Sequence, residues 1–377
     1  MAERHQKHTK LERPNKGTFG RSEWAIIGAP CGEIKKLSTK IIQQLSEEYK
    51  IAYVDADHQG ASVAKEEKTP LDYGASLVYT DKIEFHQFNH REQPEKFRLY
   101  PEFNEQDIIL INGNHFTGQH QIVIIDSRKE VSLSKKLDRL TNVQMILLTD
   151  EETPVYDFLT KHLRGIAVPI FPLDATEMIA GLIKQKIHLD TPPVYGLVLA
   201  GGKSTRMGED KGMINYHGKP QREYAADLLA PYCEKVFISC REEQLPFIET
   251  AYGLLPDTFL GLGPYGGILS AFQKHPNAAW MVVACDLPLL DGDVLDTLSG
   301  KRNPAKIATC FKSAHNEFPE PLITIWEPKS YPILLSFLSQ GYSCPRKVLI
   351  NTDALVLPTP EGDKLRNVNT PEEREEI

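Results

Sequence analysis

The stretch LVLAGGKSTRMGEDKGM, residues 197–213, gathers cations around two glycines directly after an apolar run. Gly201 and Gly202 let backbone N–H groups approach an anion, because no Cβ stands in the way. Arg206 can grip phosphate oxygens with its forked guanidinium, and Lys211 can supply a point charge. A solvated glycine turn with surface cations is the alternative. The whole pattern L-A-G-G-x-x-x-R-M-G-x-D-K is more specific than a glycine pair, and it predicts a phosphate site.

A carboxylate follows a second apolar run, where Asp286 comes after Trp280–Ala284 in the motif CDLP. An Asp at the carboxyl end of a strand can hold Mg²⁺, which uses few protein ligands and completes its shell with phosphate and water. Asp286 can alternatively cap a helix that begins near Asp291. The motif therefore indicates either a metal ligand or a helix cap.

Two further motifs accompany these. Asp257 precedes a glycine-rich loop, residues 261–268, which can wrap around a phosphorylated ligand or can simply connect a strand to a helix. Near the end, Thr370 and Glu373 form a capping box with proline at the first helical position. The asparagines of NVN, Asn367 and Asn369, can bind a polar ring or form turns.

Alternating apolar runs and helical patterns predict the elements that must position these residues, in a parallel α/β architecture throughout. Ligands of such sheets bind at the carboxyl ends of the strands. The strands expected in the first half are 24–27, 51–55, 108–111, 121–125 and 145–148, with helices at 33–48, 152–163 and 178–187. Those expected in the second half are 195–200, 235–239, 280–284, 307–311 and 355–357, with helices at 222–229, 267–274, 294–298 and 329–338.

The length of 377 residues favours two domains. We expect a flexible basic arm over 1–20, an α/β domain over 21–187, a linker over 188–193 and a second α/β domain over 194–377. The net charge of −8 argues against a nucleic-acid partner, and no apolar run predicts a membrane span or a signal peptide. The six cysteines are scattered, without a C-x-x-C pair, which indicates a reducing cytoplasm.

Taken in order, LAGGKSTRMGEDK, GPYGGI, CDLP and NVNTPEE resemble the MobA family of molybdenum cofactor guanylyltransferases. The resemblance covers residues 194 to 377 and implies a Rossmann-like nucleotidyltransferase fold. It also implies the reaction, in which the phosphate of a molybdopterin-type cofactor attacks the α-phosphorus of GTP. The products would be the guanine dinucleotide form of the cofactor and pyrophosphate, with cofactor carriers or molybdoenzymes as possible partner proteins.

The same resemblance implies the roles of individual residues. Arg206, Lys211 and Asp286 would be catalytic, with Asp286 as the ligand of the cofactor Mg²⁺, while Asn367 and Asn369 would bind the pterin side. Some members have an asparagine where this chain has Ser239, which leaves the guanine contact there, and part of the preference for GTP over CTP, open. The implied GTP-binding residues are Leu199, Ala200, Gly201, Gly202, Lys211, Ser239, Asp257 and Asp286.

In the first half, GAPCGEIK, residues 28–35, stands where a P-loop would follow the strand WAIIG. Glu33 replaces the second glycine, Ile34 the lysine and Lys35 the hydroxyl residue, so ordinary P-loop NTP hydrolysis is not expected. The layout over residues 20–185 nevertheless resembles MobB, the P-loop partner of MobA. That resemblance implies a degenerate P-loop-NTPase-like domain without a functional Walker A motif.

Polar residues follow the other strands expected in this half, namely Asp55, Asp57, His58 and His115. They can form a polar site, or they can be ordinary loop residues at strand ends. No metal is assigned to them. We expect the domain to act as a scaffold, to dimerise, or to dock a cofactor carrier.

Two other functions remain open at this level. One is a related nucleotidyltransferase that uses CTP or acts on a sugar phosphate. The other is a non-catalytic nucleotide-binding assembly protein. Because Arg206, Lys211 and Asp286 are retained together, the sequence favours an enzyme.

Overall fold

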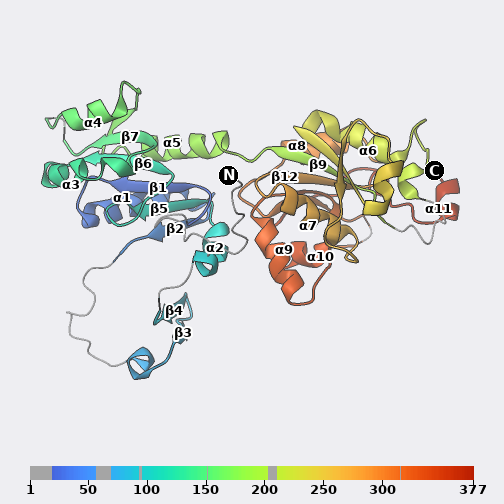
Figure 1. Cartoon of the computed structure of the whole chain (residues 1–377), viewed down its shortest axis with the longest axis horizontal. Helices are drawn as coiled ribbons and strands as arrows, with labels where there is room; N and C mark the ends of the chain where they lie inside the picture. Colours follow the sequence, from blue (N-terminus) through green and yellow to red (C-terminus); the bar gives the residue numbers. More distant parts are fainter. Residues whose placement is uncertain (1–18, 57–68, 93–95, 151, 203–209, 315) are drawn as a thin grey trace, which may run out of the picture. The chain divides into compact units, whose positions relative to one another are not determined.

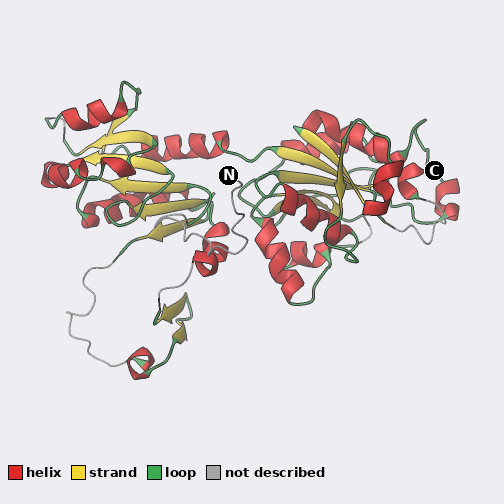
Figure 2. Cartoon of the chain, viewed as in Figure 1, coloured by secondary structure: helices red, strands yellow, loops and turns green. Residues whose placement is uncertain are grey.

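The computed structural model describes residues 19–56, 69–92, 96–150, 152–202, 210–314 and 316–377. The chain divides into two compact units, Met1–Leu189 and Asp190–Ile377, which are described separately. Each unit is built around a central sheet with helices packed against it (Figures 1 and 2).

The N-terminal unit holds a six-stranded sheet in which every strand pair is parallel. Ala25 and Ile111 lie on one face of the sheet, in an apolar cluster against which Phe103 packs from a helix. The alternate residues Trp24 and Ile26 point to the opposite face and are fully buried there. Helices therefore cover both faces of the sheet. The strand order is β2 (Ile51–Val54), β5 (Ile108–Asn112), β1 (Glu23–Ile27), β6 (His120–Ile125), β7 (Val143–Leu148) and β8 (Ile170–Pro172).

The helices of this unit are α1 (Cys31–Leu45), α2 (Lys96–Asn104), α3 (Glu130–Ser134), α4 (Asp157–Leu163) and α5 (Thr176–Leu189). Helices α1 and α5 pack against each other. Strands β3 (Leu77–Asp81) and β4 (His86–His90) form a separate antiparallel hairpin. Of the basic arm expected over 1–20, residues 1–18 lie outside the described residues. Phe19, which is described, packs against Phe103 and Phe116.

The C-terminal unit holds a seven-stranded mixed sheet with buried apolar clusters on both faces. Its order is β11 (Gly253–Pro256), β10 (Lys235–Cys240), β9 (Val194–Leu199), β12 (Ala279–Ala284), β14 (Pro319–Trp326), β13 (Ala308–Lys312) and β15 (Leu355–Leu357). Its helices are α6 (Gln221–Leu229), α7 (Pro264–Lys274), α8 (Gly292–Gly300), α9 (Ser330–Ser339), α10 (Pro345–Ile350) and α11 (Pro371–Glu375).

The expectation of parallel strands throughout was wrong for β14, which runs antiparallel to both β12 and β13. This strand was not predicted from the sequence. Pro319 and Pro321 interrupt its apolar pattern, and a proline inside a run argues against a central strand. Burial of the remaining side chains, such as Ile325 and Trp326, outweighs that local preference.

Gly28 ends β1 in a conformation that only glycine adopts without strain. Its φ is +101°, and a Cβ there would lie 2.2 Å from the carbonyl oxygen of Ile124. We expect Gly28→Ala to destabilise the N-terminal unit by roughly 3 kcal/mol, from backbone strain plus the clash. Urea unfolding followed by the fluorescence of Trp24, the sole tryptophan of residues 1–189, measures this.

Gly32 provides the matched control for this substitution. It lies in α1, and a Cβ there would have no atom of another residue within 4 Å. Gly32→Ala should therefore leave stability unchanged or raise it slightly, since alanine favours a helix. Equal unfolding midpoints for Gly28→Ala and Gly32→Ala would show that the turn after β1 tolerates a side chain.

Candidate active site

A cavity of about 820 Å³ lies at the carboxyl ends of four adjacent strands, β11, β10, β9 and β12. Parallel strands that lie side by side bring the residues after them to one edge of the sheet. Gly201 follows β9, Arg241 follows β10, Asp257 follows β11 and Asp286 follows β12, and all four line the cavity. The predicted Leu199, Ala200, Gly202, Lys211, Ser239 and Asn369 line it too.

Lys211 is held in the cavity by a short 3₁₀ turn, Lys211–Met213. The side chain of Asp210 accepts a hydrogen bond from the backbone N–H of Gly212 at 2.9 Å and so caps this turn. Asp210 also accepts from Gln244 at 3.1 Å and lies 3.8 Å from the buried guanidinium of Arg222. These contacts fix the base of the Lys211 side chain.

The ammonium of Lys211 joins two motifs that are far apart in the sequence. Its Nζ donates to Oδ1 of Asn369 at 2.6 Å and lies 3.9 Å from Oδ2 of Asp286. The backbone N–H of Val368 donates to the carbonyl of Asp286 at 2.8 Å. The C-terminal NVN segment is therefore attached to the loop after β12, and Lys211, Asp286 and Asn369 form one group.

The Asp286 carboxylate is largely withdrawn from solvent. Burial raises its pKa, nearby Glu320 adds to this, and the cation of Lys211 opposes it. Its Oδ1 is buried and has no hydrogen-bond partner among the described residues. A buried carboxylate oxygen in that state is poorly solvated, so a cationic ligand would stabilise it.

Asp257 is a second carboxylate of the cavity and is half-buried. Burial raises its pKa, while the hydroxyl of Ser239, which donates to its Oδ1 at 2.7 Å, lowers it. Oδ2 lies near Gly201, where a Cβ would stand 3.1 Å from that oxygen. Ser239 thus orients Asp257.

The glycine-rich loop 261–268 contributes to the cavity only through its first part. Gly261, Gly263 and Pro264 line the cavity, and α7 begins at Pro264. Gly267 instead packs α7 against the sheet, because a Cβ there would lie 2.7 Å from Leu199 and 3.0 Å from the Ser239 hydroxyl. Gly267 therefore allows α7 to pack closely against the sheet, as a tight strand-to-helix connection requires.

Two predicted residues are not placed in the cavity. Arg206 falls in 203–209, outside the described residues. Asn367 is half-buried and does not line the cavity, whereas Asn369 does. Thr370 caps α11, and its hydroxyl accepts from the N–H of Glu373, which confirms the predicted capping box.

Sequence reasoning missed several lining residues, among them Gly212, Arg241, Glu242, Glu243, Phe259, Leu260 and Leu322. Arg241 carried a signal, because it follows a predicted strand at the same edge as Ser239. Leu322 carried none, since β14 was not predicted.

Among the described residues, no group of three or more His, Cys, Asp or Glu side chains is arranged to hold a metal ion. For a metal ion the cavity offers the carboxylate of Asp286, with its buried Oδ1. That donor set fits Mg²⁺, which takes one or two carboxylates and receives its other oxygens from phosphates and water.

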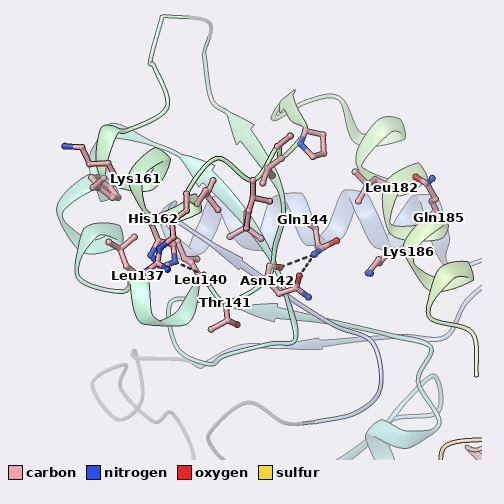
Figure 3. Close-up of a pocket in the computed structure, with 18 of the residues that line it drawn as sticks. Leu137, Leu140, Thr141, Asn142, Gln144, Lys161, His162, Leu182, Gln185 and Lys186 are labelled. Carbon is pink, nitrogen blue, oxygen red and sulfur yellow. Dashed lines mark hydrogen bonds between the residues drawn. The ribbon is translucent and has the colours of Figure 1, made fainter.

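A second cavity, of about 950 Å³, lies in the N-terminal unit (Figure 3). It is formed by residues that precede β7 and β8 and by the ends of α4 and α5. Within it Gln144 donates to Oδ1 of Asn142 at 2.6 Å, and Nε2 of His162 lies 2.8 Å from the carbonyl of Leu140. Because it lies at the amino ends of its strands, it is not at the edge where parallel sheets usually bind ligands.

No described helix is both long and apolar enough to cross a membrane.

The mixed α/β sheet, with glycines, a lysine and two carboxylates converging at its carboxyl edge, defines a nucleotidyltransferase-type domain. Residues 196–355 match the model of the MobA-like NTP transferase domain.

A molybdenum cofactor guanylyltransferase of Pseudomonas fluorescens is 31% identical over 188 residues, which cover 48% of this chain and 92% of that protein. The chain therefore belongs to the family of molybdenum cofactor guanylyltransferases.

Two other proteins are similar to parts of the chain. A molybdenum cofactor biosynthesis bifunctional protein of Synechocystis is 37% identical over 195 residues, 51% of this chain and 56% of that protein, so the match spans little more than half of that relative. The crystal structure of a MobB homologue from Bacillus stearothermophilus aligns with 44% of this chain, in its N-terminal region, and 98% of that chain, with a TM-score of 0.32 and 14% identity.

Proposed function

We propose that the C-terminal unit transfers GMP from GTP to molybdenum cofactor. A phosphate oxygen of the cofactor attacks the α-phosphorus of GTP, the bond between the α-phosphorus and the bridging oxygen breaks, and pyrophosphate leaves. Because the nucleophile is already an ionised phosphate, no general base is needed. Such a reaction depends on positioning and charge neutralisation more than on covalent participation by the protein.

The observation that carries this proposal is the group formed by Lys211, Asp286 and Asn369 in one cavity with Gly201 and Asp257. Lys211 would bind phosphate oxygens and offset the charge that grows on the leaving pyrophosphate. Arg206 is proposed to assist it. Asn369 and Asn367 would orient the pterin side.

Mg²⁺ is the proposed cofactor, held by Asp286 together with oxygens of the substrates. When bound there, it would supply positive charge next to the reacting phosphates. Its proposed place is the buried Oδ1 of Asp286, the oxygen without a hydrogen-bond partner among the described residues.

The base would be recognised by Asp257. A carboxylate accepts hydrogen bonds, and guanine offers N–H donors along one edge, whereas the corresponding edge of cytosine is richer in acceptors. The hydroxyl of Ser239 donates a hydrogen bond to Oδ1 of Asp257 and leaves Oδ2 to accept from a base in the cavity. This arrangement supports GTP over CTP.

We expect Ser239→Ala to weaken GTP binding about 10-fold, because one hydrogen bond to a carboxylate is lost and Asp257 is no longer oriented. Isothermal titration calorimetry measures the affinity. Ser339→Ala, an exposed position on α9 away from the cavity, is the control and should bind GTP normally. If Ser239→Ala also binds normally, the hydroxyl has no part in base recognition.

Incubating the full chain with Mg²⁺, molybdopterin and each of the four NTPs, and measuring pyrophosphate, tests the function itself. We expect release with GTP only, and only when molybdopterin is present. Release with CTP would favour the cytidylyl alternative, and release with a sugar phosphate would favour a sugar nucleotidyltransferase. Nucleotide binding without any release would indicate the non-catalytic assembly protein.

A cytoplasmic location is also proposed. All six cysteines lie among the described residues, and each is free. This supports a reducing compartment.

A further inference from the structure

The edge of the N-terminal sheet where a P-loop would bind phosphate carries a different group of side chains. Strands β2, β5 and β1 are neighbours, so the residues that follow them meet there. These are Asp55 after β2, Asn114 and His115 after β5, and Cys31 at the start of α1. None of them belongs to the guanylyl transfer site.

Cys31 faces an imidazole. Its Sγ lies 3.3 Å from Nε2 of His115, and Nδ2 of Asn114 donates to the same sulfur at 3.7 Å. With the ring proton on Nδ1, Nε2 accepts the S–H proton. Cys31, Asn114 and His115 are half-buried, so the group lies close to the surface of the unit.

A carboxylate lies beside the His115 ring. Oδ1 of Asp55 lies 3.9 Å from Nε2, and Asp55 is fixed by hydrogen bonds from Asn112 at 2.8 Å and from the hydroxyl of Tyr53 at 2.7 Å. A proton passed from Cys31 to His115 would therefore be stabilised by a fixed carboxylate. Cys31 and Asp55 face the same ring nitrogen, so Asp55 would act on the charge of the imidazolium and does not fix its tautomer.

Cations hold the loop that carries His115. Lys136 donates to the carbonyl of Asn114 at 3.0 Å, and Arg139 donates to that of Gly113 at 3.1 Å. The N-terminus of the 15-residue helix α1 adds positive potential at Cys31. The acidic side chain of its first turn, Glu33, lies 3.3 Å from Lys36. The surroundings of the sulfur therefore favour an anionic reactant.

We propose that Cys31 is a nucleophile that undergoes thiol–disulfide exchange with a small anionic disulfide. The sulfur of Cys31 attacks one sulfur of the disulfide as its proton passes to His115. The S–S bond of the reactant breaks, a new S–S bond forms to Cys31, and the other half leaves as a thiolate. The leaving thiolate then takes up a proton from His115 or water. The degenerate P-loop thus serves as a covalent thiol site.

The reaction of the full chain with 5,5′-dithiobis(2-nitrobenzoate), a dianionic disulfide that releases a coloured thiolate, tests this. Cys344 is exposed and serves as the internal reference, while burial raises the pKa of the half-buried Cys233 to about 12 and keeps it slow. The rate of Cys31 is measured in the C344S variant, and the rate of Cys344 in the C31S variant. We expect Cys31 to react at least about 10-fold faster than Cys344, although Cys31 is less exposed. Peptide mass mapping locates the adduct.

The variant H115Q, made in the C344S background, should slow Cys31 about 10-fold or more. Circular dichroism and an unchanged urea unfolding midpoint, followed by the fluorescence of Trp24, report that its N-terminal unit is folded. A Cys31 rate at or below that of Cys344, or an H115Q rate equal to its parent, overturns the proposal. With the neutral 2-hydroxyethyl disulfide, the advantage of Cys31 over Cys344 should shrink, and a larger advantage there would refute the preference for anions.

Discussion

Asp286→Asn is expected to reduce the rate of GMP transfer by about 1,000-fold, equivalent to roughly 4 kcal/mol of transition-state stabilisation. The substitution keeps the shape of the side chain and removes its charge. Asp286 lies at the end of β12 with Oδ1 buried and with the cation of Lys211 at 3.9 Å from Oδ2. Without the carboxylate, the proposed Mg²⁺ loses its protein ligand.

The measurement is pyrophosphate release with GTP, molybdopterin and Mg²⁺, over a range of Mg²⁺ concentrations. Asp293→Asn, an exposed residue in the first turn of α8, is the matched control and should retain full activity. Circular dichroism must show that Asp286→Asn is folded. Near-normal activity of a folded Asp286→Asn protein at every Mg²⁺ concentration would remove the assignment of the metal to this residue.

Strand ends were the part of the site that sequence could predict. Asp286 follows an apolar run that was expected as a strand, and parallel α/β topology requires residues in such places to lie at one edge of the sheet. Asp257 follows β11, which was not expected, so its place came only from the family resemblance. What sequence could not predict is which distant segments meet there. Asn369 lies 158 positions from Lys211, and their contact depends on the backbone hydrogen bond between Val368 and Asp286.

The sheet itself shows the same limit. Strands with continuous apolar runs, such as β1, β6 and β12, were expected within one or two residues of their observed bounds. Strand β14 was not predicted, because its stability comes from burial between β12 and β13 and not from local propensity. Because β14 was not expected, Leu322 could not be recognised as a residue of the cavity.

The N-terminal unit gives the clearest case. The residue types of GAPCGEIK showed that the P-loop lysine is missing, which is a local property. They could not show that Cys31 meets His115, 84 positions away, because that contact depends on β5 lying beside β1. The sequence left open whether these residues form a polar site or are ordinary loop residues. Nε2 of His115 and Oδ1 of Asp55 do lie 3.9 Å apart, whereas Asp57 and His58 fall outside the described residues.

Lys211→Met is expected to lower kcat/KM for GTP roughly 100-fold, because the side chain keeps its apolar stem and loses the ammonium that would bind phosphate oxygens. The loss should appear in GTP affinity by calorimetry as well as in kcat, since the lysine would contact the triphosphate before and during transfer. The substitution also leaves Asp286 without its neighbouring cation and Asn369 without a hydrogen-bond donor.

Lys211→Arg separates charge from geometry in this second test. Arginine restores the charge but is longer and forked, so it should recover GTP binding better than turnover. Lys219→Met is the control, because Lys219 forms an exposed ion pair with Asp227 that contributes little to folding and lies outside the cavity. Unchanged GTP affinity in Lys211→Met, with Lys219→Met also normal, would mean that the triphosphate does not lie between Gly201 and Asp286, and the proposed catalytic group would lose its common ligand.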